Sequence, residues 1–126
     1  MYLCRSLHDL QGNSHAMAGL IPADAVMTTR PVLGYMEALS LRKNILCDAG
    51  QVVRGHEFHY SRLEPPISEE LCAFTLTRRN TKASHFGGYV HGNVLASYLH
   101  VNLFGYPELA EKFIQSCIDM KHTSIT

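Results

Sequence analysis

Apolar and polar residues alternate along this chain over short stretches, a pattern typical of β-strands. The strongest stretch, residues 52–63, is rich in aromatic and β-branched residues and stops at a pair of prolines. Shorter apolar segments at residues 15–22 and 32–39 also predict strands, and residues 28–31 predict a turn that enters the second of them. Residues 71–77 predict a further strand, paired antiparallel with residues 52–63 because the connection is short for a parallel crossover.

Two segments have apolar residues at helical spacing. Residues 1–9 predict a short opening helix, and Gln11-Gly12-Asn13 predicts its end. Pro107 stands at a natural first helical position, and the residues after it predict an amphipathic C-terminal helix. The apolar positions of that helix are Leu109, Ala110, Phe113, Ile114, Cys117 and Ile118.

The composition narrows the class of protein. A chain of 126 residues with 46% hydrophobic residues predicts one globular domain. Lys+Arg and Asp+Glu balance at 11 each, so no overall charge favours nucleic acid or an anionic membrane as a partner. The first residues lack the apolar core of a signal peptide, and no run approaches the ~20 apolar residues of a membrane span. A cytoplasmic protein is expected.

The cysteines stand far apart and show no zinc or redox spacing. Reduced thiols are therefore expected. Cys72 and Cys117 are predicted at apolar core positions, Cys47 in a polar turn and Cys4 on the opening helix.

Residues 54–61, RGHEFHYS, place titratable side chains in a stretch that otherwise predicts a buried strand. Strand periodicity puts Glu57 and His59 on one face and His56 on the other. Glu57 and His59 therefore either share a polar pocket or act as buried structural groups that satisfy each other or the backbone. The zinc-protease motif is excluded, because it needs histidines at i and i+4 on a helix.

His100 follows the apolar segment 95–99 and precedes a loop. A histidine at the end of a strand is well placed to act as a general base, although a structural role is the alternative for a lone histidine. No cysteine follows a strand-to-helix elbow, and no serine has the Gly-x-Ser-x-Gly context. The residues by themselves offer a base and no nucleophile.

Four ordered segments stand out as a set: LGYME at residues 33–37, RGHEFHYS at 54–61, GNVLASYLH at 92–100 and FGYP at 104–107. Together they closely resemble the C-terminal glutaminase domain of cobyrinic acid a,c-diamide synthases. The resemblance covers nearly the whole chain. It implies an α/β fold, in which residues 1–126 form the C-terminal half of a flavodoxin-like class I glutamine amidotransferase domain, with a mixed sheet and flanking helices.

The resemblance also implies a chemistry. In that family a cysteine thiolate attacks the side-chain amide of glutamine, a histidine moves the proton, and ammonia passes to an N-terminal domain that uses ATP and magnesium to activate a corrinoid precursor. His100 matches the family histidine, with Glu57 and His59 expected to line or support the glutamine pocket. No cofactor or metal is expected in this chain itself.

The family's nucleophile has no counterpart here. Its Cys-Gly-Gly precedes a segment like Met1-Tyr2-Leu3, so the chain is expected to begin just downstream of it and to be inactive alone. The classical glutamate two residues after the histidine is replaced by Asn102. The missing half should supply most of the parallel strands, so the chain is expected to expose part of an apolar sheet and to be marginally stable or self-associating.

Three interpretations of the function remain open from the sequence. The first is part of such a glutaminase domain, active only with the missing half from a longer chain or a separate polypeptide. The second is a non-catalytic remnant that binds a corrinoid or a partner subunit. The third is a metal-binding domain that uses some of the eight histidines, with His56 and His59 as ligands.

Overall fold

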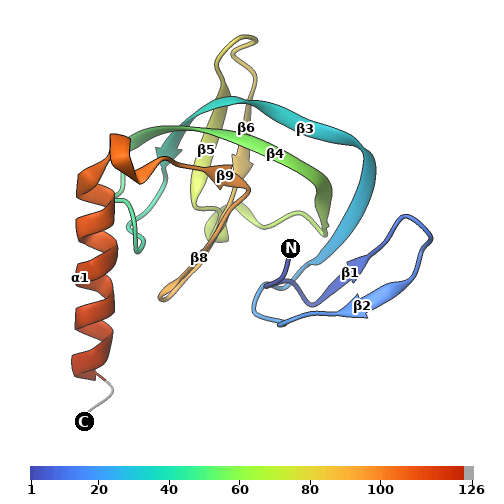
Figure 1. Ribbon diagram of the computed structural model, residues 1–126, viewed down its shortest axis with the longest axis horizontal. Coiled ribbons are helices and arrows are strands. Elements are labelled where there is room, and N and C mark those ends of the chain that lie inside the picture. Colours follow the sequence, from blue (N-terminus) through green and yellow to red (C-terminus); the bar gives the residue numbers. More distant parts are fainter. Residues whose placement is uncertain (124–126) are drawn as a thin grey trace.

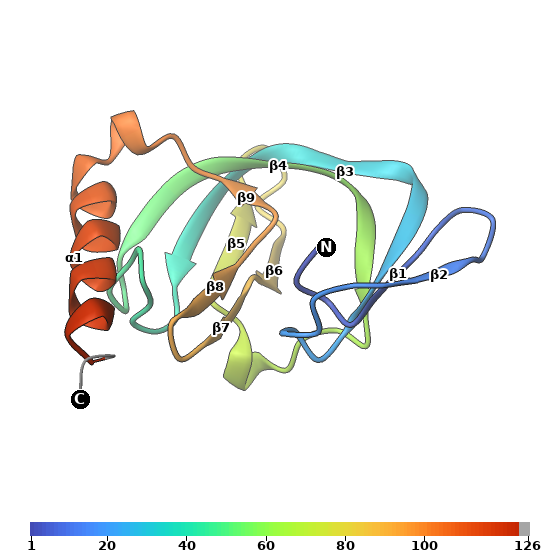
Figure 2. The same ribbon diagram turned by 60° about the horizontal axis from the view of Figure 1, so that its bottom comes forward.

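Two long strands form an arch to which the other elements are attached (Figures 1 and 2). The computed structural model describes residues 1–123, and in it β3 (Asp24–Ser40) and β4 (Val52–Glu64) run antiparallel side by side. Covered and exposed side chains alternate along β4, and along β3 from Val32 to Ser40, as expected where one face of a sheet is covered. The strand predicted at residues 52–63 is therefore confirmed.

The remaining strands extend this arch into a mixed sheet, in the order β2-β1-β3-β4-β9, with β5 paired to β3 and β6 paired to β5. A separate hairpin is formed by β7 and β8. The bounds are β1 Ser6–His8, β2 Ser14–Ala16, β5 Phe74–Arg78, β6 Ser84–Gly87, β7 Tyr89–His91, β8 Val94–Ala96 and β9 Leu99–His100, with 3-10 turns at Glu69–Leu71 and Leu103–Gly105.

β3 changes its partners halfway along. One edge pairs with β4 throughout, whereas the other edge pairs with β1 near Ala25 and with β5 from Met36 onward. The ladder with β4 is irregular between Met27 and Val32. Pro31 lies in this interval and has no N–H to donate to a ladder, which accounts for the interruption. The turn predicted at residues 28–31 is thus a break within one continuous strand.

The predicted opening helix is wrong. Cys4 forms a parallel bridge with Ile21, and β1 lies beside β3, so backbone groups of the first residues are bonded to other segments. Gly12, expected to end a helix, instead turns the β1–β2 hairpin with a φ of 87°. The Asp9 carboxyl accepts hydrogen bonds from the backbone N–H groups of Gln11 and Asn13 in that turn. Tertiary pairing therefore overrode the local helical spacing.

The partner predicted for residues 71–77 is also wrong. The strand exists as β5, but it pairs with β3 rather than with β4. A strand has two edges, and those of β4 are occupied by β3 and, at His56 and Glu57, by β9. The expected mixed sheet is confirmed, and α1 is the α-helix that residues 1–123 contribute to its flank.

The core has two parts. The larger packs β3, β4 and β5 against the first turn of α1, and the smaller lies around the N-terminal segment. The larger cluster contains Met36, Ala38, Cys47, Val53, Ala73, Phe74, Leu76, Val90 and Leu109. The smaller contains Cys4, Ile21, Ala23, Ala25 and Tyr89.

The predicted C-terminal helix is confirmed as α1 (Pro107–Thr123), which stands at one end of the arch (Figure 1). Leu109 is buried, and Lys112 forms an ion pair with Asp48. Ala110 is half-buried, and the rest of its apolar stripe, including Phe113 and Ile114, is exposed. Of the helices in residues 1–123, none is long and apolar enough to cross a membrane.

The cysteines divide into two groups. Cys4, Cys47 and Cys72 are buried, whereas Cys117 is exposed on α1. The position predicted for Cys117 in the core is wrong, because α1 packs mainly through its first turn. Burial raises the pKa of the other thiols, so they hold less thiolate at neutral pH.

We predict that iodoacetamide at neutral pH modifies Cys117 and leaves the other three cysteines unmodified in the native chain. The buried thiols are screened from the reagent and their raised pKa values reduce the reactive thiolate. Peptide mass spectrometry before and after unfolding in guanidinium checks this. Native modification of Cys4 at the rate of Cys117 would contradict the fold described for the first residues.

Candidate functional site

His100 lies in a row of side chains that crosses the outer, convex face of the arch. In the ladders Tyr35 of β3 is opposite His56 of β4, and His56 is opposite His100 of β9. Directly opposed residues share a face of a sheet, and all three are exposed. The rings of His56 and His100 stack with centroids 4.8 Å apart and planes 23° from parallel. The imidazole of His100 is thus held against β4 and open to solvent.

Gly55 allows β9 to approach β4 this closely. A Cβ at Gly55 would overlap the carbonyl oxygen of His100 and lie 3.0 Å from Cδ1 of Leu99. The residue before His56 must therefore lack a side chain for His100 to keep its position. This is a physical reason for the glycine in the RGHEFHYS segment.

Short polar contacts fix the chain on both sides of His100. Before it, the Ser97 hydroxyl accepts a hydrogen bond from the backbone N–H of Leu99, at 3.0 Å. After it, the Asn102 side chain accepts from the N–H of Phe104, at 3.0 Å, and starts the 3-10 turn. The backbone N–H of Arg54 donates to the Tyr106 hydroxyl at 2.9 Å, which fastens the following segment to β4.

A recess of about 360 Å³ surrounds this part of the outer face. Its residues come from β3, β4, β9 and the segment after β9, and no cysteine is among those that the structure describes there. They are Tyr35, Arg54, Gly55, His56, His100, Val101 and Asn102. The recess therefore offers the imidazoles of His56 and His100 without a thiol beside them.

The opposite face of β4 carries the other predicted residues. Glu57 and Ser61 are buried there and His59 is half-buried, in agreement with the period of two predicted from the sequence. Glu57 and His59 line one cavity of about 430 Å³. The shared pocket that the sequence left open as an alternative is thus present on the inner face.

Tyr98 joins these inner-face residues into a network. Its ring stacks on His59 with centroids 3.8 Å apart and planes 10° from parallel, and its hydroxyl lies 2.6 Å from Oγ of Ser61. Nδ1 of His59 lies 2.8 Å from the carbonyl oxygen of Ser61. Burial raises the pKa of Tyr98, opposed by the Ser61 hydrogen bond and reinforced by the nearby Cys4 and Glu57.

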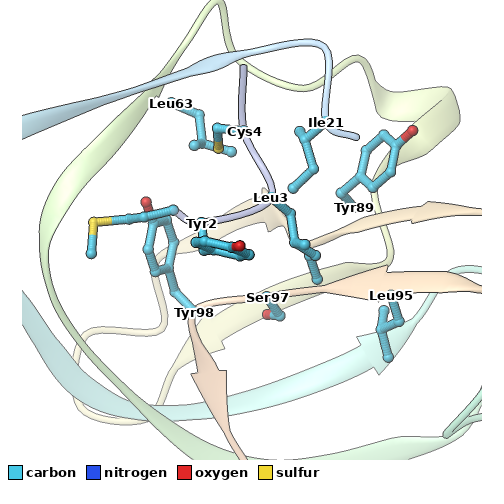
Figure 3. Close-up of a pocket in the computed structure, with 12 residues that line it drawn as sticks. Tyr2, Leu3, Cys4, Ile21, Leu63, Tyr89, Leu95, Ser97 and Tyr98 are labelled. Atoms are coloured by element: carbon cyan, nitrogen blue, oxygen red, sulfur yellow. The ribbon is translucent and has the colours of Figure 1, made fainter. Parts of the chain in front are cut away.

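Tyr98 also borders a second, mainly apolar cavity of about 320 Å³ under the N-terminal segment (Figure 3). Cys4 and Ile21 lie on one side of it, and Leu95 and Ser97 come from the segment before β9. Cys4 is fully buried against this cavity, and burial raises its pKa, so it has the environment of a structural thiol.

The predicted site residues are not brought together. Glu57 and His59 face the interior of the arch, whereas His100 is on the outer face with His56. The support predicted from Glu57 and His59 would reach His100 through the pairing of β4 with β9, and through Tyr98, which stacks on His59 and precedes His100 by two residues.

Tyr98 and His85 were not predicted from the sequence as members of this inner group. His85 lines the same cavity, with its Nε2 atom 3.6 Å from Oε2 of Glu57. The stacking of Tyr98 on His59 joins residues 39 positions apart and leaves no local signal in the sequence.

A shared metal site for His56 and His59 is contradicted by their positions on opposite faces of β4. Within the described part of the chain, no group of three or more His, Cys, Asp or Glu side chains is arranged to hold a metal ion.

Comparison with protein families gives one match of high coverage. The model of the CobB/CobQ-like glutamine amidotransferase domain matches residues 1–107, which include both faces of β4 and the whole of β9. The match ends as α1 begins.

Curated proteins similar to the chain are cobyrinate a,c-diamide synthases. The one from Synechococcus sp. is 40% identical over 117 residues, and the one from Caldanaerobacter subterraneus is 36% identical over 118 residues. Each alignment covers 93% of this chain. The one from Salmonella typhimurium is 36% identical over 115 residues, 90% of this chain. The chain spans about a quarter of the length of these relatives, from 25% to 26%.

We predict that Gly55→Ala displaces β9 and lowers the free energy of unfolding by about 1–3 kcal/mol, because the new methyl group overlaps the backbone of His100. Gly105→Ala is the matched control, since a Cβ there has open space and should change stability by less than about 0.5 kcal/mol. Urea unfolding measures both values. The nuclear Overhauser effect between the rings of His56 and His100 should also weaken in Gly55→Ala, and an unchanged ring contact with unchanged stability would contradict the close approach.

Proposed function

This chain belongs to the CobB/CobQ-like glutamine amidotransferase domain family, and from that membership we propose that it is the histidine-bearing part of a glutaminase domain. The parent activity proposed is that of a cobyrinate a,c-diamide synthase, the name carried by its similar curated proteins. The chain then works together with the polypeptide that supplies the nucleophile, as part of one longer chain or as a separate one.

The observation that carries this proposal is the placement of His100. Its imidazole is exposed at the end of β9, held by the stack with His56 and by the close approach over Gly55. A general base must lie within hydrogen-bond reach of the group from which it takes a proton. An imidazole on an open outer face is accessible to a thiol brought by another segment, whereas the inner-face His59 is half-buried and covered by the ring of Tyr98.

The proposed role of His100 is to carry a proton through glutamine hydrolysis. His100 takes the proton of the cysteine thiol, and the thiolate attacks the side-chain amide carbon of glutamine. The C–N bond breaks, and ammonia leaves with the proton that His100 returns. Water then attacks the thioester, with His100 accepting its proton and passing it to the departing thiolate as glutamate is released.

Glu57 and His59 have a supporting part in this proposal. Glu57 is opposite Leu99 in the ladder, so the inner-face packing of β4 holds the strand on which His100 stands. ATP and magnesium belong, in the same proposal, to an N-terminal domain of the parent enzyme that activates the corrinoid precursor, in the cytoplasm. Neither is assigned to residues of this chain.

A second candidate function is a non-catalytic module that binds a partner subunit or a corrinoid. The observation that favours it is the apolar content of the outer face. Leu33, Tyr35 and Phe58 are exposed to 58%, 73% and 51%, and Leu33 is directly opposite Phe58 in the ladder. Such a surface favours association with another polypeptide.

We predict that His100→Ala lowers glutaminase activity at least about 100-fold in a chimaera that joins the upstream glutaminase segment of the Synechococcus relative to this chain. The loss should appear in kcat, because the imidazole acts on protons in the transition state. Release of glutamate from glutamine is the measurement. His91→Ala is the matched control, since His91 is exposed on the β7–β8 hairpin.

Activity unaffected by His100→Ala would refute the catalytic assignment. A chimaera that folds and binds a partner subunit or a corrinoid, but hydrolyses no glutamine, would support the non-catalytic binding module instead.

We predict that the isolated chain self-associates through its outer face. Leu33→Ser combined with Phe58→Ser should shift it toward the monomer, because the double variant removes opposed apolar side chains from one patch. Phe104→Ser is the control, since Phe104 is 99% exposed in the 3-10 turn. Sedimentation velocity over a concentration series decides, and a wild-type chain that stays monomeric throughout and melts cooperatively would contradict the prediction.

A further inference from the structure

The imidazole of His100 has no hydrogen-bond partner among residues 1–121. A histidine that moves protons is normally oriented by a third group, which bonds to the ring nitrogen that does not react. Asn102 is close in the chain, but its side chain accepts a hydrogen bond from the backbone N–H of Phe104 instead. Glu57 faces the other side of the sheet. The orientation of the His100 ring therefore depends on a contact of another kind.

The backbone of His100 is held over a short length only. β9 has two residues, and its register pairs with β4 are confined to them. β4 has 13 residues and is paired with β3 at both of its ends. A segment with few pairings opens more readily than one with many. The side chains of β4 are therefore the fixed reference against which a side chain on β9 can be oriented.

The side chain of β4 whose ring contacts His100 is that of His56. The ring centroids are 4.8 Å apart and the planes 23° from parallel, within the range at which aromatic rings attract each other. A histidine ring has only broad preferences of its own for rotation about the Cβ–Cγ bond. A second ring against one face restricts that rotation. Because the stack covers a face, the edge of the His100 ring that carries both nitrogens stays open.

We propose that His56 is the positioning residue for His100, and that its ring fixes the plane of the His100 imidazole so that the nitrogen receiving the thiol proton keeps one direction. The inference rests on the proposed glutaminase function, because His56 takes part in that reaction only through His100. His56 itself takes up no proton and touches no reacting atom. The role requires an aromatic face, so a phenyl ring should replace the imidazole of His56, whereas a methyl group should not.

The test uses the chimaera described above, with release of glutamate from glutamine as the measurement. His56→Ala should lower kcat about 3- to 10-fold, the loss expected for one aromatic contact, and should change the KM for glutamine less than about twofold. His56→Phe should keep kcat within about twofold of the wild-type value. Tyr60→Ala is the matched control and should leave kcat unchanged, because Tyr60 lies on the same face of β4 but its ring contacts Phe58.

A spectroscopic measurement on the 126-residue chain reports the ring contact independently of activity. In the ¹H NMR spectrum, the carbon-bound ring protons of His100 should be shifted upfield by the ring current of His56. His56→Ala should remove this shift, and His56→Phe should retain an upfield shift. If His56→Ala fails to fold, His56→Leu, which has a bulky side chain without a ring, takes its place in both measurements.

The outcomes separate this inference from the function on which it rests. A wild-type chimaera without activity, or activity unaffected by His100→Ala, would overturn the glutaminase proposal and the role of His56 with it. Activity lost in His100→Ala but unchanged in His56→Ala would overturn the role of His56 alone. A kcat that falls as far in His56→Phe as in His56→Ala would do the same, because the ring nitrogens of His56, and not its aromatic face, would then be required.

Discussion

The antiparallel pairing of β3 with β4 is the constraint on which the rest of this structure depends. Side chains of a strand alternate between two faces, so the register of this one pair decides which titratable groups are enclosed and which are exposed. With Tyr35 opposite His56, the imidazoles of His56 and His100 reach the outer face. With Gly34 opposite Glu57, the carboxyl lies inside. A shift of one residue would exchange the two chemistries.

The two faces of β4 are therefore chemically separate although they share one strand. The outer face combines two stacked, exposed imidazoles with exposed apolar side chains such as Phe58, an arrangement suited to a surface completed by another polypeptide. The inner face combines Glu57, His59 and Tyr98 beside a cavity with mainly apolar walls that opens to solvent. The short segment of residues 54–61 thus contributes side chains to two faces that do not touch.

Some of this arrangement is readable from the sequence because the determining interactions are local. The alternation in residues 54–61 and the apolar stripe after Pro107 follow from the periods of strand and helix, and both elements form as predicted. The opening segment shows the limit of that reasoning. Its helical spacing was misleading because Cys4 and β1 are paired with residues about 17 to 18 positions later, and distant partners leave no periodic signal.

The sequence by itself determined that Glu57 and His59 share one face and that His56 has the other, because adjacent side chains of any strand point to opposite sides. It also determined the family, through segments specific enough to identify it. The tertiary structure alone decided that His100 belongs with His56 and not with Glu57, because that assignment depends on the register between β4 and β9. It likewise decided that Tyr98 covers His59 and that one oxygen of Glu57 is buried without a hydrogen bond, since both follow from packing between residues far apart in the chain.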